Sequence, residues 1–590
     1  MTVFGIKATN LVKKYLFKIT FILLNRLFLK FVSRRKMTQI TRRNFLSLLS
    51  KKSLGTLAIP YILANCGNFN NLIAAPSKLN QNVLNDLKDF PIKSLQATAS
   101  DNLELAEGLS YDVLIKWNDK ISKRETFGYN NDFTCFIPID DNPNDGILWV
   151  NHEYTNPLFV SGYDFYDYNM RRSIDQIDKE MKSVGGSILR VKKENDKWKF
   201  ISDDKLNKRI DAKTRMKFNW DKPIKGTKYP IGTNSNCSGG VTPWGTILTC
   251  EENYDMFFGE TLYDQNNRST HENSPLDWEK FYNYPPEHYG WVVEVNPLTG
   301  ECQKHVALGR FKHECCTLIK LEDERVVAYS GDDENNQFIY KFISSKPNSL
   351  KDGTLYVADT INGKWISLDY DSQPKLKEKF KDQTEVLIRV REAAKILGAT
   401  PQNRPEDIEI DPLTGNIIIA LTNNARKRDF HGSVLKIIEK NNKYDELSFS
   451  SEIMLTGGKE SEFTCPDNLC FDLAGNLWLT SDMSGSLMNK RGPYYPKFKN
   501  NGVYVLLRHG VDAGKIIQVA SAPYDAELTG PWFSPDYKTL FLSVQHPGEK
   551  SKSLKSLTSK WPHDDDGIPK PSVVTIQGKL LDKLNYLNQI

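Results

Sequence analysis

The stretch IEIDPLTGNIIIAL (residues 408–421) is typical of a β-hairpin. β-Branched residues on both sides favour strands. Between them Asp411 and Pro412 occupy the first two positions of a type I turn, where these residue types are preferred, and Gly415 follows near its end. The segment therefore predicts two antiparallel strands joined by a tight turn.

The same pattern recurs in VVEVNPLTGE (292–301), LCFDLAGNLWLTSD (469–482) and PWFSPDYKTLFLSV (531–544), and the last three copies start about 60 residues apart. A second pair, GSILRVKKENDKWKF (186–200) and GSVLKIIEKNNKYDELSF (432–449), is also similar. Repeats of this length, each worth about four strands, are the signature of propeller blades. A β-sandwich with ordinary hairpins is the alternative.

The fold class that these repeats predict is all-β, a six-bladed β-propeller with helical and loop insertions. Six blades fit the roughly 490 residues that follow residue 100. Segments KLKEKF and VLIRVREAAKILG, within residues 375–398, are the exception and favour helices. In a propeller the loops converge at one mouth of a central channel, so ligands far apart in sequence could meet there.

Charge is divided unevenly along the chain. Residues 1–66 hold 13 Lys or Arg and no acidic residue, which leaves 65 basic against 73 acidic residues and a formal charge of about −8 beyond them. An acidic body lacks the basic footprint that nucleic-acid binding requires. It suits a protein that binds cations. Nine cysteines in 590 residues do not form a disulfide scaffold, and there is no CxxC pair.

The N-terminal region is interpreted as a targeting segment. Residues 1–36 are basic and apolar, too interrupted by Lys and Asn to span a membrane well, and could be an over-extended start before Met37. Residues 37–76 contain TRRNFL (41–46), which resembles a twin-arginine export signal. The alternative is a basic, amphipathic segment at a membrane surface.

This interpretation predicts a periplasmic or extracellular protein whose partner is the twin-arginine export machinery. The membrane would be met only during export or through lipid on Cys66, although LANC (63–66) is a poor lipoprotein box. Residues 77–590 would form the folded domain.

Several segments contain side chains that commonly bind metal ions, next to Gly and Pro residues. The densest is NCSGGVTPWGTILTCEEN (236–253); the others are WVNHEYTNP (149–157), GRFKHECC (309–316), YSGDDENNQFIYKF (329–342), NRPEDIEIDP (403–412) and CPDNLCFD (465–472). Oxygen-rich clusters suit calcium, and an added thiolate favours iron or zinc. Taken singly, each carboxylate could instead be a paired surface group and each cysteine a small buried hydrophobe.

Together these motifs, with FGYNND, TGPWFSPD and QHPGE, resemble the PhoX-type alkaline phosphatases from about Phe127 to Glu549. The resemblance implies a twin-arginine-exported enzyme that hydrolyses phosphomonoesters at a calcium and iron site (Ca²⁺, Fe³⁺) in the channel mouth. Another calcium-dependent propeller hydrolase, a phosphodiesterase or a lactonase, is the alternative, as is a surface propeller with structural calcium.

The resemblance also implies residue roles. Arg404 would contact the phosphate and, with Asn236, is assigned to catalysis. The iron thiolate would be Cys237 or Cys250, with a preference for Cys250 because Glu251 and Glu252 follow it. The remaining residues assigned to the metals are Glu153, Glu251, Glu314, Glu406, Asp332, Asp333, Asp467 and Asn468.

Overall fold

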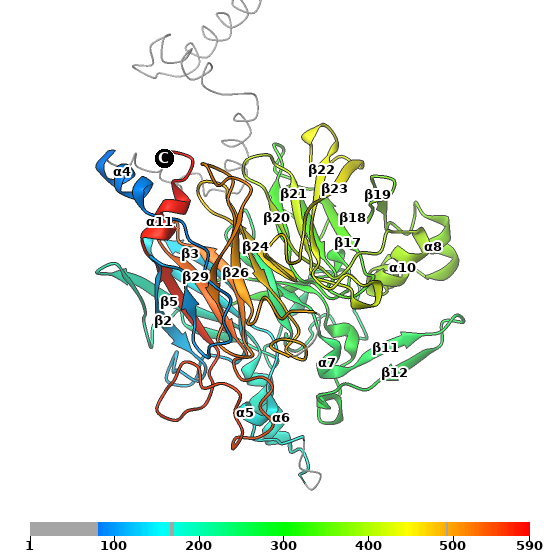
Figure 1. Ribbon diagram of the computed structural model, residues 1–590. Coiled ribbons are helices and arrows are strands. Elements are labelled where there is room, and N and C mark those ends of the chain that lie inside the picture. Colours follow the sequence, from blue (N-terminus) through cyan, green and yellow to red (C-terminus); the bar gives the residue numbers. More distant parts are fainter. Residues whose placement is uncertain (1–80, 166–169, 491–493) are drawn as a thin grey trace, which may run out of the picture. The chain divides into compact units, whose positions relative to one another are not determined.

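The computed structural model describes residues 81–165, 170–490 and 494–590, which belong to one compact unit, Ile59–Ile590. The two N-terminal segments predicted above, 1–36 and 37–76, lie outside the described residues. Within the described chain, six mainly antiparallel sheets of four or five strands form the six blades of a β-propeller (Figure 1). The predicted fold class is confirmed, and the sandwich alternative is wrong.

Each blade runs from an innermost strand outward. Blade 1 contains β3 (Asn131–Ile139), β4 (Asn142–His152), β5 (Gly185–Glu194), β6 (Lys197–Phe200) and β7 (Lys208–Ile210). Blade 2 contains β9 (Asn236–Val241), β10 (Ile247–Glu251), β13 (Val292–Val295), β14 (Cys302–His305) and β8 (Lys217–Phe218). Blade 3 contains β15 (Thr317–Lys320), β16 (Val326–Gly331), β17 (Ile339–Ser344), β18 (Gly353–Asp359) and β19 (Lys364–Ser367).

The other three blades follow the same order. Blade 4 contains β20 (Pro405–Ile410), β21 (Ile417–Leu421), β22 (Ser433–Glu439) and β23 (Phe449–Thr456). Blade 5 contains β24 (Pro466–Phe471), β25 (Leu477–Ser481), β26 (Gly502–Leu506), β27 (Ile516–Ser521) and β1 (Glu104–Leu105). Blade 6 contains β28 (Glu527–Phe533), β29 (Leu540–Gln545), β30 (Ser572–Gln577) and β2 (Ser110–Lys116), so an early strand completes the last blade.

The repeated turn marks equivalent places in three blades. Residues 408–421, 469–482 and 531–544 each join the innermost strand to the second strand. The copy at 292–301 is also a hairpin, but it joins β13 and β14, the third and fourth strands of blade 2. The 60-residue spacing therefore measured one blade, as predicted.

The run Ile417–Leu421 shows why blades stack. Ile417 and Ile419 pack in one apolar cluster with β15 and β16 of blade 3. Ile418 and Ala420 pack in another cluster with β24 and β25 of blade 5. Because successive side chains of a strand point to opposite faces, an uninterrupted apolar run buries both faces of the sheet. The core therefore lies between blades.

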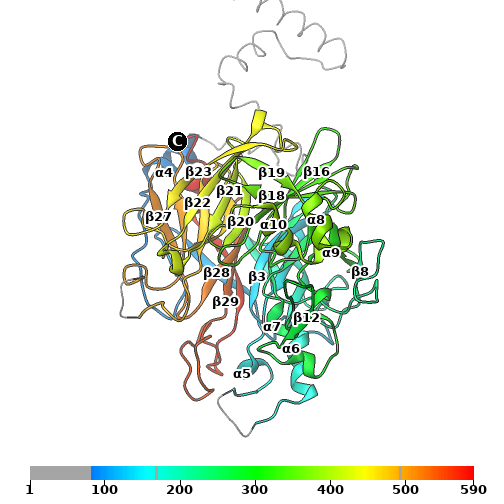
Figure 2. The ribbon, with the colours of Figure 1, turned by 90° about the vertical axis from the view of Figure 1, so that its right-hand side faces the viewer.

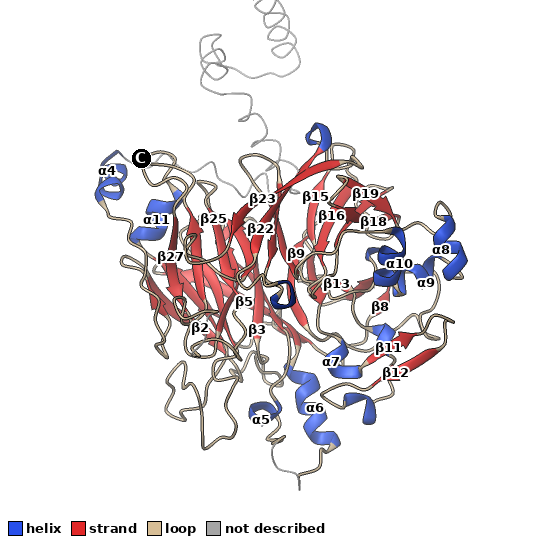
Figure 3. Cartoon of the chain, turned by 45° about the vertical axis from the view of Figure 1, so that its right-hand side comes forward, coloured by secondary structure: helices blue, strands red, loops and turns tan. Residues whose placement is uncertain are grey.

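Helices and a small hairpin lie outside the blades (Figures 2 and 3). The predicted helical region contains α8 (Pro374–Lys379), α9 (Gln383–Ile388) and α10 (Val390–Leu397). The other elements are α4 (Gln81–Asp89), α5 (Pro157–Val160), α6 (Ile174–Ser183), α7 (Asp255–Phe258), β11 (Glu260–Tyr263), β12 (Ser269–Glu272) and α11 (Lys579–Asn585). No helix among the described residues is long and apolar enough to cross a membrane.

Gly530 in β28 allows blades 6 and 1 to approach closely. Its φ is +56°, and a Cβ there would lie 2.6 Å from Asp132 O and 2.7 Å from Phe133 Cα. Thr134 Oγ1 donates a hydrogen bond of 2.8 Å to Gly530 O across the same contact. We expect Gly530→Ala to destabilise the protein by about 1–3 kcal/mol through the clash, beyond the strain of a positive φ.

Gly514→Ala is the matched control, because Gly514 also has a positive φ, +89°, but has open space around the added Cβ. Thermal unfolding of the two variants measures the difference. Equal melting temperatures would show that the packing between blades 6 and 1 leaves room for a Cβ at residue 530.

Candidate active site

The innermost strands all begin at the same end of the ring, and each blade places one acidic or thiol side chain there. These six residues are Asp132, Cys237, Glu314, Glu406, Asp467 and Glu527. The second strand of each blade is antiparallel to the first and ends at the same place, so it adds further polar side chains. These are Glu153, Glu252, Asp333, Thr422, Asp482 and Gln545. We call the twelve side chains of these two sets the acidic ring.

Four blades share a backbone device at this end. The residue before the innermost strand has a positive φ in each: Asn130 (+42°), Ser235 (+52°), Arg404 (+52°) and Cys465 (+46°). A non-glycine residue in this region costs about 1–2 kcal/mol. Such strain persists only where the surrounding structure enforces it, and it concentrates at functional sites.

A one-residue β-bulge follows each of these residues. In blade 4, Pro405 pairs with Leu421 and Ile408 with Ile419, so three steps on β20 match two on β21. Such bulges re-aim side chains near active sites. The four bulges span Asn131–Thr134, Asn236–Gly239, Pro405–Ile408 and Pro466–Leu469, and the second residue of each is Asp132, Cys237, Glu406 or Asp467.

The bulges also join neighbouring blades. The Asp407 carboxylate accepts hydrogen bonds of 2.9 Å from Ile408 N and from Leu469 N of blade 5. Asn468 Oδ1 accepts one of 2.8 Å from Gly530 N of blade 6. In blades 4 and 5 the third residue of the bulge therefore links neighbouring blades, while the second faces the site. Asn468, a predicted metal ligand, has this inter-blade role.

Two groups of side chains are close enough to hold metal ions. In each group, one ligand atom per residue lies within 4.8 Å of the others. The first group consists of Glu153, Cys237 and Glu252, and the second of Glu314, Glu406 and Asp467.

Asp132 joins the first group, because Cys237 Sγ donates a hydrogen bond of 3.3 Å to its Oδ2. Gln545 Nε2 then donates to Asp132 Oδ2 at 3.2 Å and to Glu153 Oε2 at 2.7 Å. The amide thus connects two carboxylates of the ring.

Electrostatics at the site are dominated by negative charge. Burial, followed by repulsion between carboxylates, raises the pKa of Asp132 and Glu153 to about 8. The same two causes hold the pKa of the other acidic ligands well above the ordinary range: Glu252, Glu314, Glu406 and Asp467. Without cations, these groups favour the protonated form.

Glu314 provides the clearest test of whether metal ions fit. Its side chain is fully buried, yet neither carboxylate oxygen has a hydrogen-bond partner. A buried carboxylate without partners is destabilising unless a cation or a proton satisfies it. The donor set of carboxylates with one thiol suits calcium together with iron or zinc. The residues present therefore fit the metals that the sequence predicted.

Arg404 lies at this end of the ring but is already engaged. Its Nε and Nη2 each donate to Asp333 at 2.8 Å, and Nη1 donates to Asp482 at 3.0 Å. Nη2 also lies 2.7 Å from Glu406 Oε1. Asp333 therefore occupies the Nε–Nη2 edge, the edge with which an arginine can bind a phosphate through two hydrogen bonds. Nη1 donates one of its two N–H groups to Asp482, which leaves the second for a substrate, and the side chain is 22% exposed.

Asn236 is buried in a closed polar network. Its Nδ2 donates to Thr233 Oγ1 and Thr249 Oγ1, both at 2.9 Å, and its Oδ1 accepts from Thr233 at 3.1 Å. Thr249 in turn donates to Asn151 at 2.7 Å. Asn236 thus orients the backbone that carries Cys237.

Three other predicted ligands point elsewhere. Cys250 is fully buried in an apolar cluster that includes Trp291. Glu251 forms a buried ion pair of 2.6 Å with Lys304. Asp332 accepts from Arg391, whose Nε donates at 2.9 Å. The structure therefore brings Cys237, rather than Cys250, to the acidic ring.

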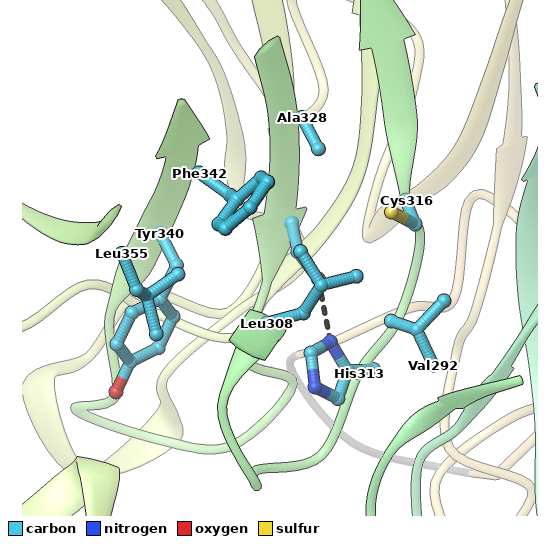
Figure 4. A pocket seen from close by; sticks show the side chains of 9 residues that line it. Val292, Leu308, His313, Cys316, Ala328, Tyr340, Phe342 and Leu355 are labelled. Carbon is cyan, nitrogen blue, oxygen red and sulfur yellow. Dashed lines mark hydrogen bonds between the residues drawn. The ribbon is translucent and has the colours of Figure 1, made fainter. Parts of the chain in front are cut away.

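His313, next to Glu314, also faces away from the ring. Nδ1 lies 3.0 Å from Ser330 Oγ, and Nε2 lies 2.9 Å from Gly309 O. The imidazole of His313 stacks on the phenyl group of Phe311 with a centroid distance of 3.5 Å. Figure 4 shows His313 beside Val292 and Leu308 at a small, mainly apolar cavity. Its partners make it a packing residue beneath the site.

Sequence reasoning missed several residues of the ring. Glu252 was passed over for its neighbour Glu251, and Asp482, Glu527 and Gln545 were not proposed. Asp132 lies in FGYNND, which was noted only as a motif. The available signal was positional: each missed residue stands at the start of an innermost strand or the end of a second strand.

The fold and the site together define the class of protein, a six-bladed propeller with a candidate metal site at one mouth of its channel. The family model "Alkaline phosphatase PhoX" matches residues 90–548. The chain belongs to the PhoX alkaline phosphatase family, whose members are phosphomonoesterases, and the predicted family and enzyme class are confirmed.

One solved structure supports this assignment, and a second is only a weaker structural match. Pseudomonas fluorescens PhoX, determined in complex with vanadate, a transition-state analogue, is 28% identical with a TM-score of 0.72, covering 83% of this chain and 98% of that chain. A protein of unknown function from Dyadobacter fermentans is 8% identical with a TM-score of 0.38, covering 80% and 100%. No curated protein sequence matches the chain significantly.

Thr422 positions Glu406, because its Oγ1 donates a hydrogen bond of 2.6 Å to Glu406 Oε1. The same oxygen lies 3.0 Å from Pro466 O in blade 5. We expect Thr422→Val to lower kcat about 10- to 150-fold, corresponding to roughly 1.5–3 kcal/mol for a hydrogen bond to a charged group. Hydrolysis of p-nitrophenyl phosphate measures the effect.

Thr422→Ser keeps the hydroxyl and serves as the control, with near-normal turnover expected. If valine and serine variants were equally active, Thr422 would have no positioning role.

Proposed function

We propose that this enzyme hydrolyses phosphomonoesters at the acidic ring, with calcium and iron ions as cofactors. The observation that supports the proposal is convergence: all six blades contribute a carboxylate or thiol to one mouth of the propeller. A structural calcium site would stiffen one turn and would not draw ligands from six blades. The solved P. fluorescens relative, with vanadate bound, supports phosphoryl chemistry for the family.

Ligand chemistry suggests how the two metals would be divided. Glu153, Cys237 and Glu252 combine oxygen with sulfur, which suits iron. Glu314, Glu406 and Asp467 offer only oxygen, which suits calcium. Cations held there would neutralise the phosphate and support attack on phosphorus.

The chain's own groups prepare this site. A cysteine must lose its proton to bind a metal. Cys237 Sγ already donates to Asp132 Oδ2, so Asp132 is positioned to receive that proton. Gln545 holds Asp132 and Glu153 in place through Nε2.

Arg404 would contribute the positive charge that orients the substrate. Its guanidinium is held by Asp333 and Asp482, so its position is fixed before substrate arrives. Nη1 would donate to a phosphoryl oxygen, where transition-state charge develops. The strained φ of +52° helps to aim this side chain.

The two cysteines of the segment 236–253 provide a matched test. We expect Cys237→Ser to lower iron content and turnover of p-nitrophenyl phosphate by about 10- to 100-fold. Cys250→Ser should keep the ratio of metal to protein and instead lower stability by about 1–3 kcal/mol, because a hydroxyl would enter an apolar cluster. Elemental analysis, turnover and thermal unfolding separate the two effects.

The same measurements on natively exported protein test the proposal itself. Chelation should remove calcium and iron together with activity, and adding the metals back should restore it. Full turnover by protein free of both metals would refute the metal-assisted mechanism. Loss of iron in Cys250→Ser but not in Cys237→Ser would reverse the assignment of the thiolate.

We also propose export by the twin-arginine route, which would deliver the folded enzyme to the periplasm or beyond. The support is the sequence TRRNFL (41–46). Replacing Arg42 and Arg43 by Lys should block export and leave the phosphatase activity in the cytoplasm. Cell fractionation measures where the activity is found. Unchanged export of that variant would contradict the route.

A further inference from the structure

The loop between β21 and β22 carries three consecutive basic residues on the same end of the propeller as the acidic ring. We call residues 423–429 (NNARKRD) the rim loop. Arg426, Lys427 and Arg428 are exposed. Among the described residues, no carboxylate forms an ion pair with any of the three side chains, although the chain has many surface ion pairs elsewhere.

A series of hydrogen bonds connects the acidic ring to the rim loop. Thr422, directly before the loop, donates to Glu406. Asn423 Nδ2 lies 3.6 Å from the sulfur of Cys465, and Asn424 Nδ2 donates to Asn403 Oδ1 at 3.1 Å. These contacts hold the loop against the residues that flank Arg404.

Lys427 ends this series. Its Nζ donates a hydrogen bond of 3.1 Å to Asn403 Oδ1, and Asn403 directly precedes Arg404. From Thr422 to Arg426 the chain advances four residues, which span at most about 14 Å even when extended. The basic side chains therefore lie within the reach of a small substrate bound beside Arg404.

Neutral amides and one carboxylate complete the surroundings. The carboxylate is Asp429, whose Oδ2 accepts a hydrogen bond of 2.8 Å from Asn403 Nδ2 and whose Oδ1 accepts one of 2.9 Å from Gly432 N. Asn335 pairs with Asn403 as an isolated bridge, and Asn336 Oδ1 accepts from Asn424 at 3.4 Å. Asn335 and Asn336 are exposed. Exposed amides beside Arg and Lys side chains that form no ion pair among the described residues can donate to a phosphate or hydroxyl group without adding negative charge.

We propose that the rim loop is a second anion subsite, which selects phosphomonoesters carrying another anionic group distant from the scissile phosphate. The proposal rests on the proposed function, since the scissile phosphate must occupy the acidic ring. A sugar bisphosphate is the substrate class that fits: one phosphate lies beside Arg404, and the other meets Arg426 and Lys427. Sugar monophosphates would lack the second contact.

The test compares two substrates that share one scaffold, fructose 6-phosphate and fructose 1,6-bisphosphate. In Arg426→Gln/Lys427→Gln we expect KM for the bisphosphate to rise about three- to tenfold, with kcat and the monophosphate constants unchanged. Wild-type preference for the bisphosphate should also disappear near 1 M salt, where screening acts over about 3 Å.

Lys440→Gln/Lys443→Gln removes the same charge from the turn between β22 and β23, at the opposite end of blade 4 (Figure 1). This control should leave both KM values unchanged. An equal rise of KM for both substrates in the rim variant, or no change, would overturn the subsite. Failure of the wild-type enzyme to hydrolyse either sugar phosphate would instead count against the proposed function.

Discussion

Repulsion among buried carboxylates is the constraint on which this structure depends. Two carboxylates about 5 Å apart repel by roughly 3 kcal/mol at an effective dielectric constant of about 20. The ring holds two groups of ligands at that spacing, and Arg404 is the cation in closest contact with them. Only a rigid frame can keep such groups together, and only cations or protons can relieve them. Burial raises the pKa of each acidic ligand most, and the same repulsion raises it further.

The propeller supplies that frame through one repeated backbone device. A residue with positive φ precedes a one-residue bulge in four blades, and the bulge turns its second side chain toward the ring. Its third side chain can bridge to the next blade, as Asp407 and Asn468 do. The interactions that position ligands are therefore also interactions that close the propeller. The strain at Arg404 and Cys465 is distributed over this network.

The fold was largely predictable because its signals are local. Turn residues at 411–415 and the apolar run at 417–421 specify a hairpin buried on both faces, and the spacing of similar hairpins measures a blade. The site was less predictable. Cys250 lies next to two glutamates in sequence, but strand alternation places it on the apolar face of β10, and the ring receives Glu252 beyond the strand end. The sequence assigned Asn236 to catalysis and Asn468 to the metals, yet their hydrogen-bond partners make both residues supports for the acidic ring.

What the sequence by itself determined is the architecture and the family, since both depend on turn chemistry, periodicity and motif order along the chain. Tertiary structure alone decided which side chains share a site. A bulge shifts a strand by one residue and so exchanges the face that each side chain occupies, which composition does not reveal. The choice of Cys237 over Cys250, the engagement of Arg404 by Asp333, and the inclusion of Asp132 all follow from that shift and from contacts between blades.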